Sequence, residues 1–291
     1  MSKPVHYGGQ ALIEGVMMRG PKDIAIAVRL PDGSIALERQ AIKPWSSYPV
    51  LKLPVIRGFV SLIDSLIIGI RALTFSANLA AEGEGEEIKP FEMFLTIVLA
   101  FGLGLLLFVA LPTGAAHLVR SFIPGAIWQN ILEGIIRMAV FLLYVVAISR
   151  MKDIQRVFQY HGAEHKAIYA YEEGLELTVE NTKKFTTLHP RCGTSFLLIV
   201  MTISIVVFAF LPLTPLWLRI LSRFLAMPLV AGFSYEILKF SGYHHKSPWL
   251  RWAIVPGLWL QKLTTREPDD EQIEVAIQSL KTIVESGQEL A

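Results

Sequence analysis

The chain has 291 residues, of which 53% are hydrophobic and only 18% are charged, and its mean hydropathy is +0.47. Soluble domains carry about a quarter charged residues, so this composition excludes an ordinary soluble domain and a disordered chain. The single cysteine, Cys192, excludes an intramolecular disulfide, and a net charge of +2 gives no general attraction to nucleic acid. The composition predicts an α-helical integral membrane protein.

Residues 1–50 are predicted to form a small β-rich segment. Residues 23–42 alternate between apolar and polar side chains around a Pro-Asp-Gly turn, which is typical of a β-hairpin. The preceding stretch HYGGQALIEGVMMRGP holds four glycines around Glu14 and Arg19. Glycine lets a ligand approach the backbone, and Arg19 could hold a phosphate or carboxylate. Taken alone, however, this stretch is better interpreted as turns between short strands.

Residues 51–92 are predicted to form an amphipathic helix followed by an acidic linker. Between residues 55 and 80, the charged residues Arg57, Asp64 and Arg71 recur every seven positions and therefore share one helical face. We expect this helix to lie in the membrane interface or to re-enter from it, rather than to span. The linker, residues 81–89, is expected to be solvated.

About four transmembrane helices are predicted, because a span needs about 20 mostly apolar residues. Residues 93–149 hold the first two and residues 195–240 the last two, and the apolar stretches are 94–111, 131–149, 195–213 and 217–240. Residues 241–267 are rich in tryptophan and are predicted to lie in the interface. Residues 268–291 have the start signals and apolar spacing of a soluble amphipathic helix.

The distribution of Lys and Arg predicts the orientation. Residues 150–194 carry seven of them, whereas residues 113–129 carry one. Basic loops stay in the cytoplasm, so this long loop, the N-terminal sheet and both termini are predicted to be cytoplasmic. The first twelve residues are too polar for a signal peptide. We therefore predict a multi-pass protein of the cell inner membrane.

Four charged residues fall near the predicted outer ends of the second and fourth spans: Glu133, Arg137, Arg219 and Arg223. They would form a partly buried cluster if these helices were neighbours. Mutual pairing, with arginines reaching toward the interface, is the favoured interpretation. A site for an anionic lipid headgroup is the alternative.

The cytoplasmic loop contains His161, Glu164 and His165 in an H-x-x-E-H arrangement. Histidines four apart on a helix point the same way, so their imidazoles can share a metal ion. A neighbouring glutamate can accept a proton from a water that the metal activates. The order matches the inverted zincin motif, although only as a five-residue string. Alternatively, these histidines hydrogen-bond the loop to lipid headgroups or to the helix bundle.

The same loop ends in HPRCGTSF, which adds His189 and Cys192 as candidate ligands. Three interpretations of Cys192 remain open: a metal ligand, a reactive thiol near the positive end of a helix, and a small residue packed at a helix start. Glu172 and Glu173 are alternative third ligands. Four ligands would make a closed structural site, whereas three would leave one position open.

The three segments GGQALIEGVMMRGP, YHGAEHKAIYAYE and HPRCGTSF together resemble the signatures of the YqhQ-like family. This is a bacterial family of membrane proteins of unknown function, described in general terms as predicted metal-dependent enzymes. The resemblance covers nearly the whole chain short of its tail. It implies that the family's motif positions are Glu14, Arg19, His161, Glu164, His165, His189 and Cys192.

The first hypothesis is therefore a cytoplasm-facing, metal-dependent membrane enzyme, most simply a hydrolase. His161 and His165 would bind a divalent ion, with His189 or Cys192 as third ligand. Glu164 would be the general base, and Arg19, beside Glu14, would orient an anionic substrate at the membrane surface. A thiolate ligand favours zinc; without it, manganese or iron fits equally well.

Two other classes of function remain open. A membrane scaffold or regulator would hold a purely structural metal with all four ligands. A lipid or anion transporter would use the outer arginines. In each case membrane lipids are the expected partners, no nucleic acid is expected, and the sequence leaves the oligomeric state open.

Overall fold

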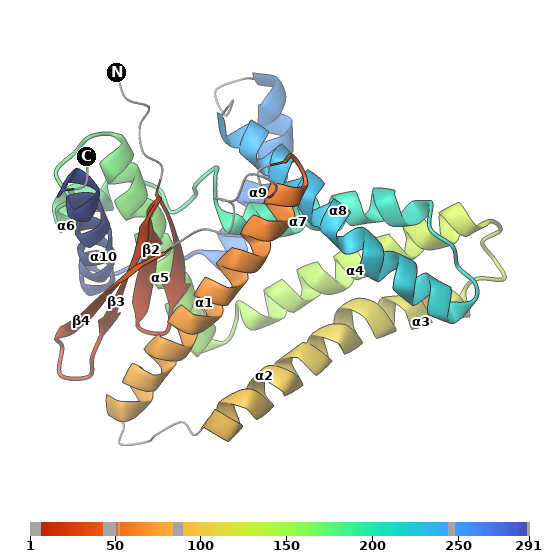
Figure 1. The fold of residues 1–291 in the computed structure, drawn as a ribbon, viewed down its shortest axis with the longest axis horizontal. Coiled ribbons are helices and arrows are strands. Elements are labelled where there is room, and N and C mark those ends of the chain that lie inside the picture. The colour runs from red at the N-terminus through yellow and green to blue at the C-terminus, as the bar shows by residue number, and fades with distance from the viewer. Residues whose placement is uncertain (1–6, 43–50, 52, 84–89, 244–247, 290–291) are drawn as a thin grey trace.

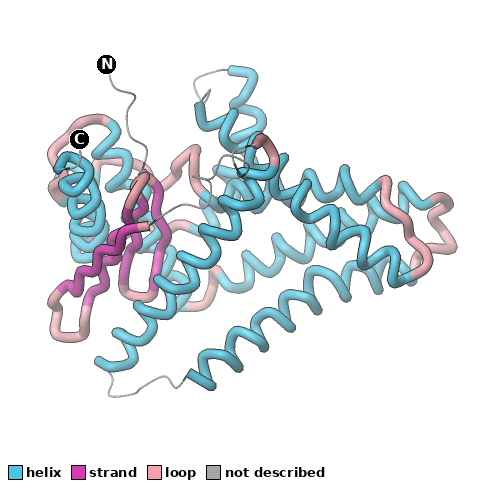
Figure 2. The backbone as a smooth tube through the Cα atoms, in the orientation of Figure 1, coloured by secondary structure: helices cyan, strands magenta, loops and turns pink. Residues whose placement is uncertain are grey.

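The computed structural model describes residues 7–42, 51, 53–83, 90–243 and 248–289 (Figure 1). Most of the predicted acidic linker lies outside these residues. Helices make up most of the described chain, and the strands gather at one end of the molecule (Figure 2).

A four-stranded antiparallel sheet forms near the N-terminus in the order β1-β2-β3-β4. The strands are β1 (Gly8–Leu12), β2 (Gly15–Arg19), β3 (Asp23–Arg29) and β4 (Ile35–Ala41). The hairpin predicted over residues 23–42 is confirmed as β3 and β4. The glycine-rich stretch before it forms a second hairpin, β1 and β2, in which Gly9 pairs with Met18.

Both faces of the sheet are covered by helices. One face packs Val16, Met18, Ala25 and Ala27 against α5 (Lys152–Glu172) and α10 (Asp270–Glu289). The other face packs Leu12, Met17, Ile24, Ile26 and Val28 against α1 (Ile56–Gly83). Because neither face meets water, β2 and β3 bury successive side chains rather than alternate ones.

The amphipathic helix predicted from residue 268 onward is α10. Its start is held by a reciprocal capping pair, in which the Gln272 N–H donates to Asp269 Oδ1 at 2.8 Å and the Asp269 N–H donates to Gln272 Oε1 at 3.0 Å. Its apolar face, including Ile273, Ala276 and Leu280, is fully buried against the sheet and α5. This burial ties the C-terminal helix to the N-terminal sheet.

Four stretches of the described residues are long and apolar enough to cross a membrane: Ile56–Ala81, Phe91–Leu118, Ala126–Ile148 and Trp217–Phe240. They lie in α1, in the run of α2 (Pro90–Leu105), η3 (Leu106–Ala110) and α3 (Leu111–Leu118), in α4 (Ala126–Ile148) and in α8 (Leu216–Tyr243). The number agrees with the four predicted spans, but one member differs.

The difference concerns α7 and α1. The predicted third span is α7 (Gly193–Ala209), which has only 17 residues. It ends early because Pro212 and Pro215 follow, and proline disfavours helical backbone at the residue before it. In turn α1, which was predicted to be interfacial, has 28 residues. It packs against the sheet through Ile68 and Ala72, so its interfacial placement stays a prediction.

The last elements bring the C-terminal part of the chain across α5. Helix α6 (Val179–Lys183) lies after α5, and α9 (Pro248–Thr264) covers most of the tryptophan-rich segment. The residues after α9 cross α5 closely, because the Arg266 N–H donates to the Phe158 carbonyl at 2.9 Å. A Cβ at Gly162 would lie 2.1 Å from the Arg266 carbonyl oxygen, so this crossing requires glycine.

Candidate metal centre

Helix α5 presents His161 and His165 on one face. They are four residues apart, which is just over one turn, and their ring centroids are 4.4 Å apart. Both side chains are largely enclosed, His165 almost completely. The predicted helical spacing of the two imidazoles is therefore present.

Backbone carbonyls fix the tautomer of both histidines. His161 Nδ1 lies 2.8 Å from the Thr264 carbonyl oxygen, and His165 Nδ1 lies 2.5 Å from the Thr187 carbonyl oxygen. A carbonyl only accepts hydrogen bonds, so each Nδ1 carries the proton and each Nε2 keeps a lone pair. Metal-binding histidines in proteins are oriented in the same way.

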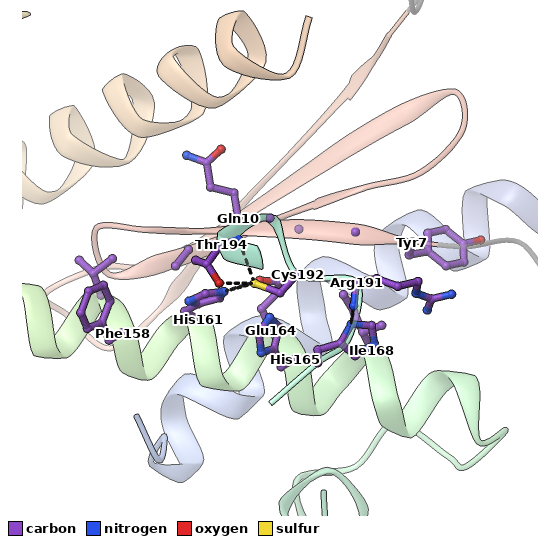
Figure 3. A pocket seen from close by; sticks show the side chains of 16 residues that line it. Tyr7, Gln10, Phe158, His161, Glu164, His165, Ile168, Arg191, Cys192 and Thr194 are labelled. Carbon is purple, nitrogen blue, oxygen red and sulfur yellow. Dashed lines mark hydrogen bonds and ion pairs between the residues drawn. The ribbon is translucent and has the colours of Figure 1, made fainter. Parts of the chain in front are cut away.

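Cys192 completes a group of three candidate ligands. Its Sγ lies 3.2 Å from His161 Nε2, and the ligand atoms of His161, His165 and Cys192 all lie within 4.8 Å of one another. Cys192 is also the N-cap of α7, where its Sγ accepts the Thr194 N–H at 3.4 Å. Figure 3 shows these side chains meeting between α5 and the loop that precedes α7.

The three ligand atoms lie close enough to one another to hold a metal ion. Tetrahedral zinc bonds of about 2.0–2.3 Å place neighbouring N and S ligands about 3.3–3.6 Å apart. The His161 Nε2–Cys192 Sγ distance of 3.2 Å is slightly shorter than this range. The wider limit of 4.8 Å requires only a small closure of the group.

Glu164 lies beside this group and is buried. Its Oε2 is 4.0 Å from His161 Nε2, and the backbone N–H of Gly9 in β1 donates to its carboxylate. Burial raises the pKa of the Glu164 carboxyl above its ordinary value, although the two nearby histidines act in the opposite direction. A Cβ at Gly9 would lie 2.8 Å from Glu164 Cγ, so glycine is needed where β1 passes over this side chain.

His189 lies close by but outside the group of three. Its ring centroid is 5.6 Å from that of His165. Its Nδ1 accepts the Arg191 N–H at 3.3 Å, and its Nε2 lies 3.6 Å from Glu172 Oε2, too far for a hydrogen bond. Burial lowers the pKa of both His165 and His189 and favours their neutral form. The four predicted ligands therefore do not converge on one point.

The predicted alternative ligands, Glu172 and Glu173, end α5. Glu172 pairs with Arg191 and approaches His189, and Glu173 is the exposed C-cap of the helix. Neither belongs to the group formed by His161, His165 and Cys192.

Glu14 and Arg19 contact other parts of the molecule. Glu14, in the β1–β2 turn, forms a two-point ion pair with Arg156 and accepts the Tyr160 hydroxyl at 3.2 Å. Arg19 donates to Asp64 Oδ2 of α1 at 2.6 Å and to Ser65. Side chains alternate along β2, so Arg19 shares the α1 face with Met17, whereas Met18 faces the helices of the opposite face. Arg19 is therefore not brought to the histidines.

A cavity of about 400 Å³ opens onto the candidate ligands. Its walls are residues 7–11 of the β1 region, the His161 face of α5, and the loop 189–194 (Figure 3). The cavity reaches Glu164, both α5 histidines and Cys192. A small substrate group can therefore approach the group of three from this side.

Gln261 supports the loop that carries Cys192. Its amide donates to the His189 carbonyl at 2.9 Å and to Ser195 Oγ at 3.1 Å, and it accepts the His189 N–H at 2.8 Å. The side chain is completely buried. Sequence reasoning missed Gln261 and the carbonyls of Thr187 and Thr264, because such contacts come from segments distant along the chain.

Comparison with known proteins gives two matches. A family model described as "Protein of unknown function (DUF1385)" matches residues 53–286. A Bacillus subtilis (strain 168) protein named "Uncharacterized protein YqhQ" is 36% identical over 295 residues, covering 97% of this chain and 93% of that protein. No solved structure matches. All three candidate ligands lie inside the matched family region, whereas the sheet precedes it.

Proposed function

This chain belongs to the DUF1385 family and is a relative of YqhQ, and we propose that it is a metal-dependent hydrolase acting at a membrane surface. The match confirms the resemblance to the YqhQ-like family that its three motifs indicate. Neither description states an activity, so the proposal depends on the geometry of the candidate metal centre.

One observation carries the proposal: two imidazoles and one thiol direct their ligand atoms at a shared point beside a buried carboxylate. The carbonyls of Thr264 and Thr187 occupy both Nδ1 positions, so the free lone pairs are on Nε2. Holding two lone pairs together in a buried place is unfavourable unless a proton or a cation lies between them. A divalent cation, with zinc preferred for its affinity for thiolate, meets this need.

Each residue then has a defined role. Zinc bound by His161, His165 and Cys192 would polarise a substrate oxygen and lower the pKa of water. Glu164, 4.0 Å from His161 Nε2, is placed to accept a proton from a water in the cavity and to return it to the leaving group. The Gly9 N–H donates to that carboxylate, and both residues line the cavity.

The position of His189 favours an enzyme over a scaffold. A purely structural site would use four ligands. Here His189 Nδ1 is taken by the Arg191 N–H and its Nε2 lies toward Glu172. Three ligands with a cavity beside them are the pattern of a catalytic site with one open position.

We place the site on the cytoplasmic side of the inner membrane. The N-terminal sheet and the C-terminal helix α10 lie with α5 at the same end of the molecule (Figure 1). The excess of Lys and Arg in residues 150–194 supports the cytoplasmic assignment. A substrate attached to lipid, or lying on the membrane surface, would then reach the cavity.

Metal content tests the ligand assignment. The full chain, purified in a neutral detergent and dialysed against micromolar zinc, is expected to hold about one zinc ion, which elemental analysis measures. His165→Ala and Cys192→Ala are expected to lose it. His117→Ala is the matched control, because His117 is exposed on α3 and lies outside the candidate metal centre. A metal-free wild type, or retention of zinc by His165→Ala, would overturn the assignment.

Glu164→Gln separates a hydrolase from a structural metal site. We expect this variant to keep its zinc and to lose zinc-dependent hydrolysis by about 100-fold or more, assayed with chromogenic p-nitrophenyl esters and phosphates and a fluorogenic protein. If wild type binds zinc but hydrolyses none of these probes faster than Glu164→Gln, the zinc is structural and the hydrolase proposal is wrong.

A further inference from the structure

A second buried cluster is formed by charged residues of α4 and α8 and has no role in the proposed hydrolase. Glu133 of α4 is 1% exposed, and its carboxylate contacts three guanidinium groups. Arg137 Nη2 lies 2.8 Å from Glu133 Oε1, and Arg223 Nη2 lies 2.9 Å from Glu133 Oε2. Arg219 also donates to this carboxylate. The sequence-based expectation that these residues pair is therefore confirmed.

The pairing leaves an excess of positive charge. Three guanidinium groups face one carboxylate, so the cluster carries a formal excess of two positive charges. All three arginines are 92% buried, each having 8% of its surface exposed. Among the ion pairs of the described residues, all three arginines pair with Glu133, and the other acidic residue of α8, Glu236, pairs with Arg57 instead. Buried charges of one sign are costly in a membrane unless something compensates them.

Neutral partners within the chain compensate only in part. Arg137 Nε donates to the Phe108 carbonyl at 2.9 Å, and Arg223 Nη2 donates to Asn130 Oδ1 at 3.0 Å. The guanidinium carbons of Arg137 and Arg223 also lie 5.5 and 5.8 Å from the ring centre of Phe208. Within the described part of the chain, however, the Nε atoms of Arg219 and Arg223 have no hydrogen-bond partner.

We propose that this cluster is a binding site for a phosphate group. A guanidinium group matches the geometry of phosphate oxygens and keeps its charge, and two unpartnered Nε–H donors remain for a ligand. A phosphate monoanion or dianion would remove one or both of the excess charges. The site is separate from the candidate metal centre, because its charged residues lie within the first twelve residues of α4 and the first eight of α8.

The position of the cluster suits a ligand that comes from the membrane. Arg219 and Arg223 are the fourth and eighth residues of α8, so they lie about 5–10 Å below the helix start. The neighbouring side chains Ile220, Leu221 and Phe224 are exposed and apolar, as expected of a lipid-facing surface. Both an anionic phospholipid headgroup and free inorganic phosphate could supply the phosphate, and the experiment separates these two sources.

The test measures anion binding to the full chain in a neutral detergent. The probes are phosphatidylglycerol, phosphatidylcholine and inorganic phosphate, and native mass spectrometry and thermal unfolding are the readouts. We expect Arg219→Gln to weaken binding of phosphatidylglycerol, of inorganic phosphate, or of both by about fivefold. Arg120→Gln is the matched control, because Arg120 is exposed in the loop at the same end.

Two further variants keep the test decisive. Glu133→Gln raises the excess charge to three, and we expect it to bind the same probe more tightly than wild type does. Arg219→Lys keeps the positive charge but loses the paired N–H donors of the guanidinium group. We therefore expect this variant to fold and to bind the probe with an affinity between those of wild type and Arg219→Gln. An effect confined to phosphatidylglycerol identifies a lipid headgroup, and one produced by inorganic phosphate identifies a soluble anion. Equal binding of all probes to wild type and to Arg219→Gln or Arg219→Lys would overturn the proposal.

Discussion

The two buried polar clusters of this protein have opposite electrostatic character. In the candidate metal centre, the imidazoles of His161 and His165 donate outward to backbone carbonyls and direct their lone pairs inward. In the arginine cluster of α4 and α8, three guanidinium groups converge on the single carboxylate of Glu133. The first cluster is rich in lone pairs, and the second has an excess of cations. The buried side chains themselves therefore indicate which ligand each cluster favours, a cation in the first and an anion in the second.

The difference also separates two uses of buried glutamate. Glu133 is held by charge and joins α4 to α8. Glu164 has no direct ion pair shorter than 4.0 Å among the described residues and is held by the Gly9 N–H. A carboxylate tied to three arginines is unavailable for proton transfer, whereas one held by a backbone donor can exchange a proton.

The same substitution in both clusters gives the largest expected effect. We expect Glu133→Gln to lower the free energy of unfolding by about 3–5 kcal/mol, because it leaves three buried guanidinium groups without an anion. Glu164→Gln is expected to cost less than about 1 kcal/mol, because the amide oxygen can still accept the Gly9 N–H. Denaturant unfolding in detergent, followed by tryptophan fluorescence, measures both. Equal losses would show that the two glutamates are held in the same way.

Much of the fold was predictable from the sequence because local patterns determine it. The alternation of residues 23–42 gave the β3–β4 hairpin, and the apolar spacing after residue 268 gave α10. The length of α7 and the contacts of α1 were not predictable in this way. Mean hydropathy over a sequence window does not show where a proline ends a helix. It also does not show which face of α1 packs against the sheet.

In the candidate site, too, the residues related by local spacing were predictable, whereas contacts made by distant segments were not. The i,i+4 spacing of His161 and His165 predicted a shared position on a helix, and Cys192 joins them. The inclusion of Glu14 and Arg19 relied on motif resemblance, and the sheet carries both to other contacts. The sequence shows Gly9 only as one of two adjacent glycines. Glycine is needed there because β1 passes close to the Glu164 side chain, which only the structure shows.

The adjacent residues Gly8 and Gly9 provide a matched pair of variants beside the candidate metal centre. Gly9→Ala places a Cβ 2.8 Å from both Glu164 Cγ and the Met17 carbonyl oxygen. We expect a loss of about 1–3 kcal/mol in stability, measured by denaturant unfolding, because the strand or the carboxylate must shift. Gly8→Ala is the matched control, since a Cβ there meets nothing within 4 Å. If both variants were equally stable, β1 would not be packed on Glu164 as described.

A substitution of Gln261 tests whether this residue of α9 positions the loop that carries Cys192. Gln261→Leu removes three hydrogen bonds to His189 and Ser195 but touches no candidate ligand atom. We expect the affinity for zinc, measured by competition with a chelating dye, to fall about tenfold. The control Gln278→Ala changes an exposed residue of α10 and should leave the affinity unchanged. An unchanged affinity in Gln261→Leu would mean that the loop is held by other contacts.

The smallest expected effect concerns Glu14, where the sequence prediction and the geometry differ most. Its ion pair with Arg156 is half exposed on the arginine side, so water screens the attraction. A double-mutant cycle with Glu14→Gln and Arg156→Gln should give a coupling energy below about 1 kcal/mol. Zinc affinity should stay within about twofold of wild type, because Glu14 holds the β1–β2 turn against α5 rather than facing the cavity. A tenfold loss of zinc affinity in Glu14→Gln would instead assign Glu14 to the candidate metal centre, as its motif suggests.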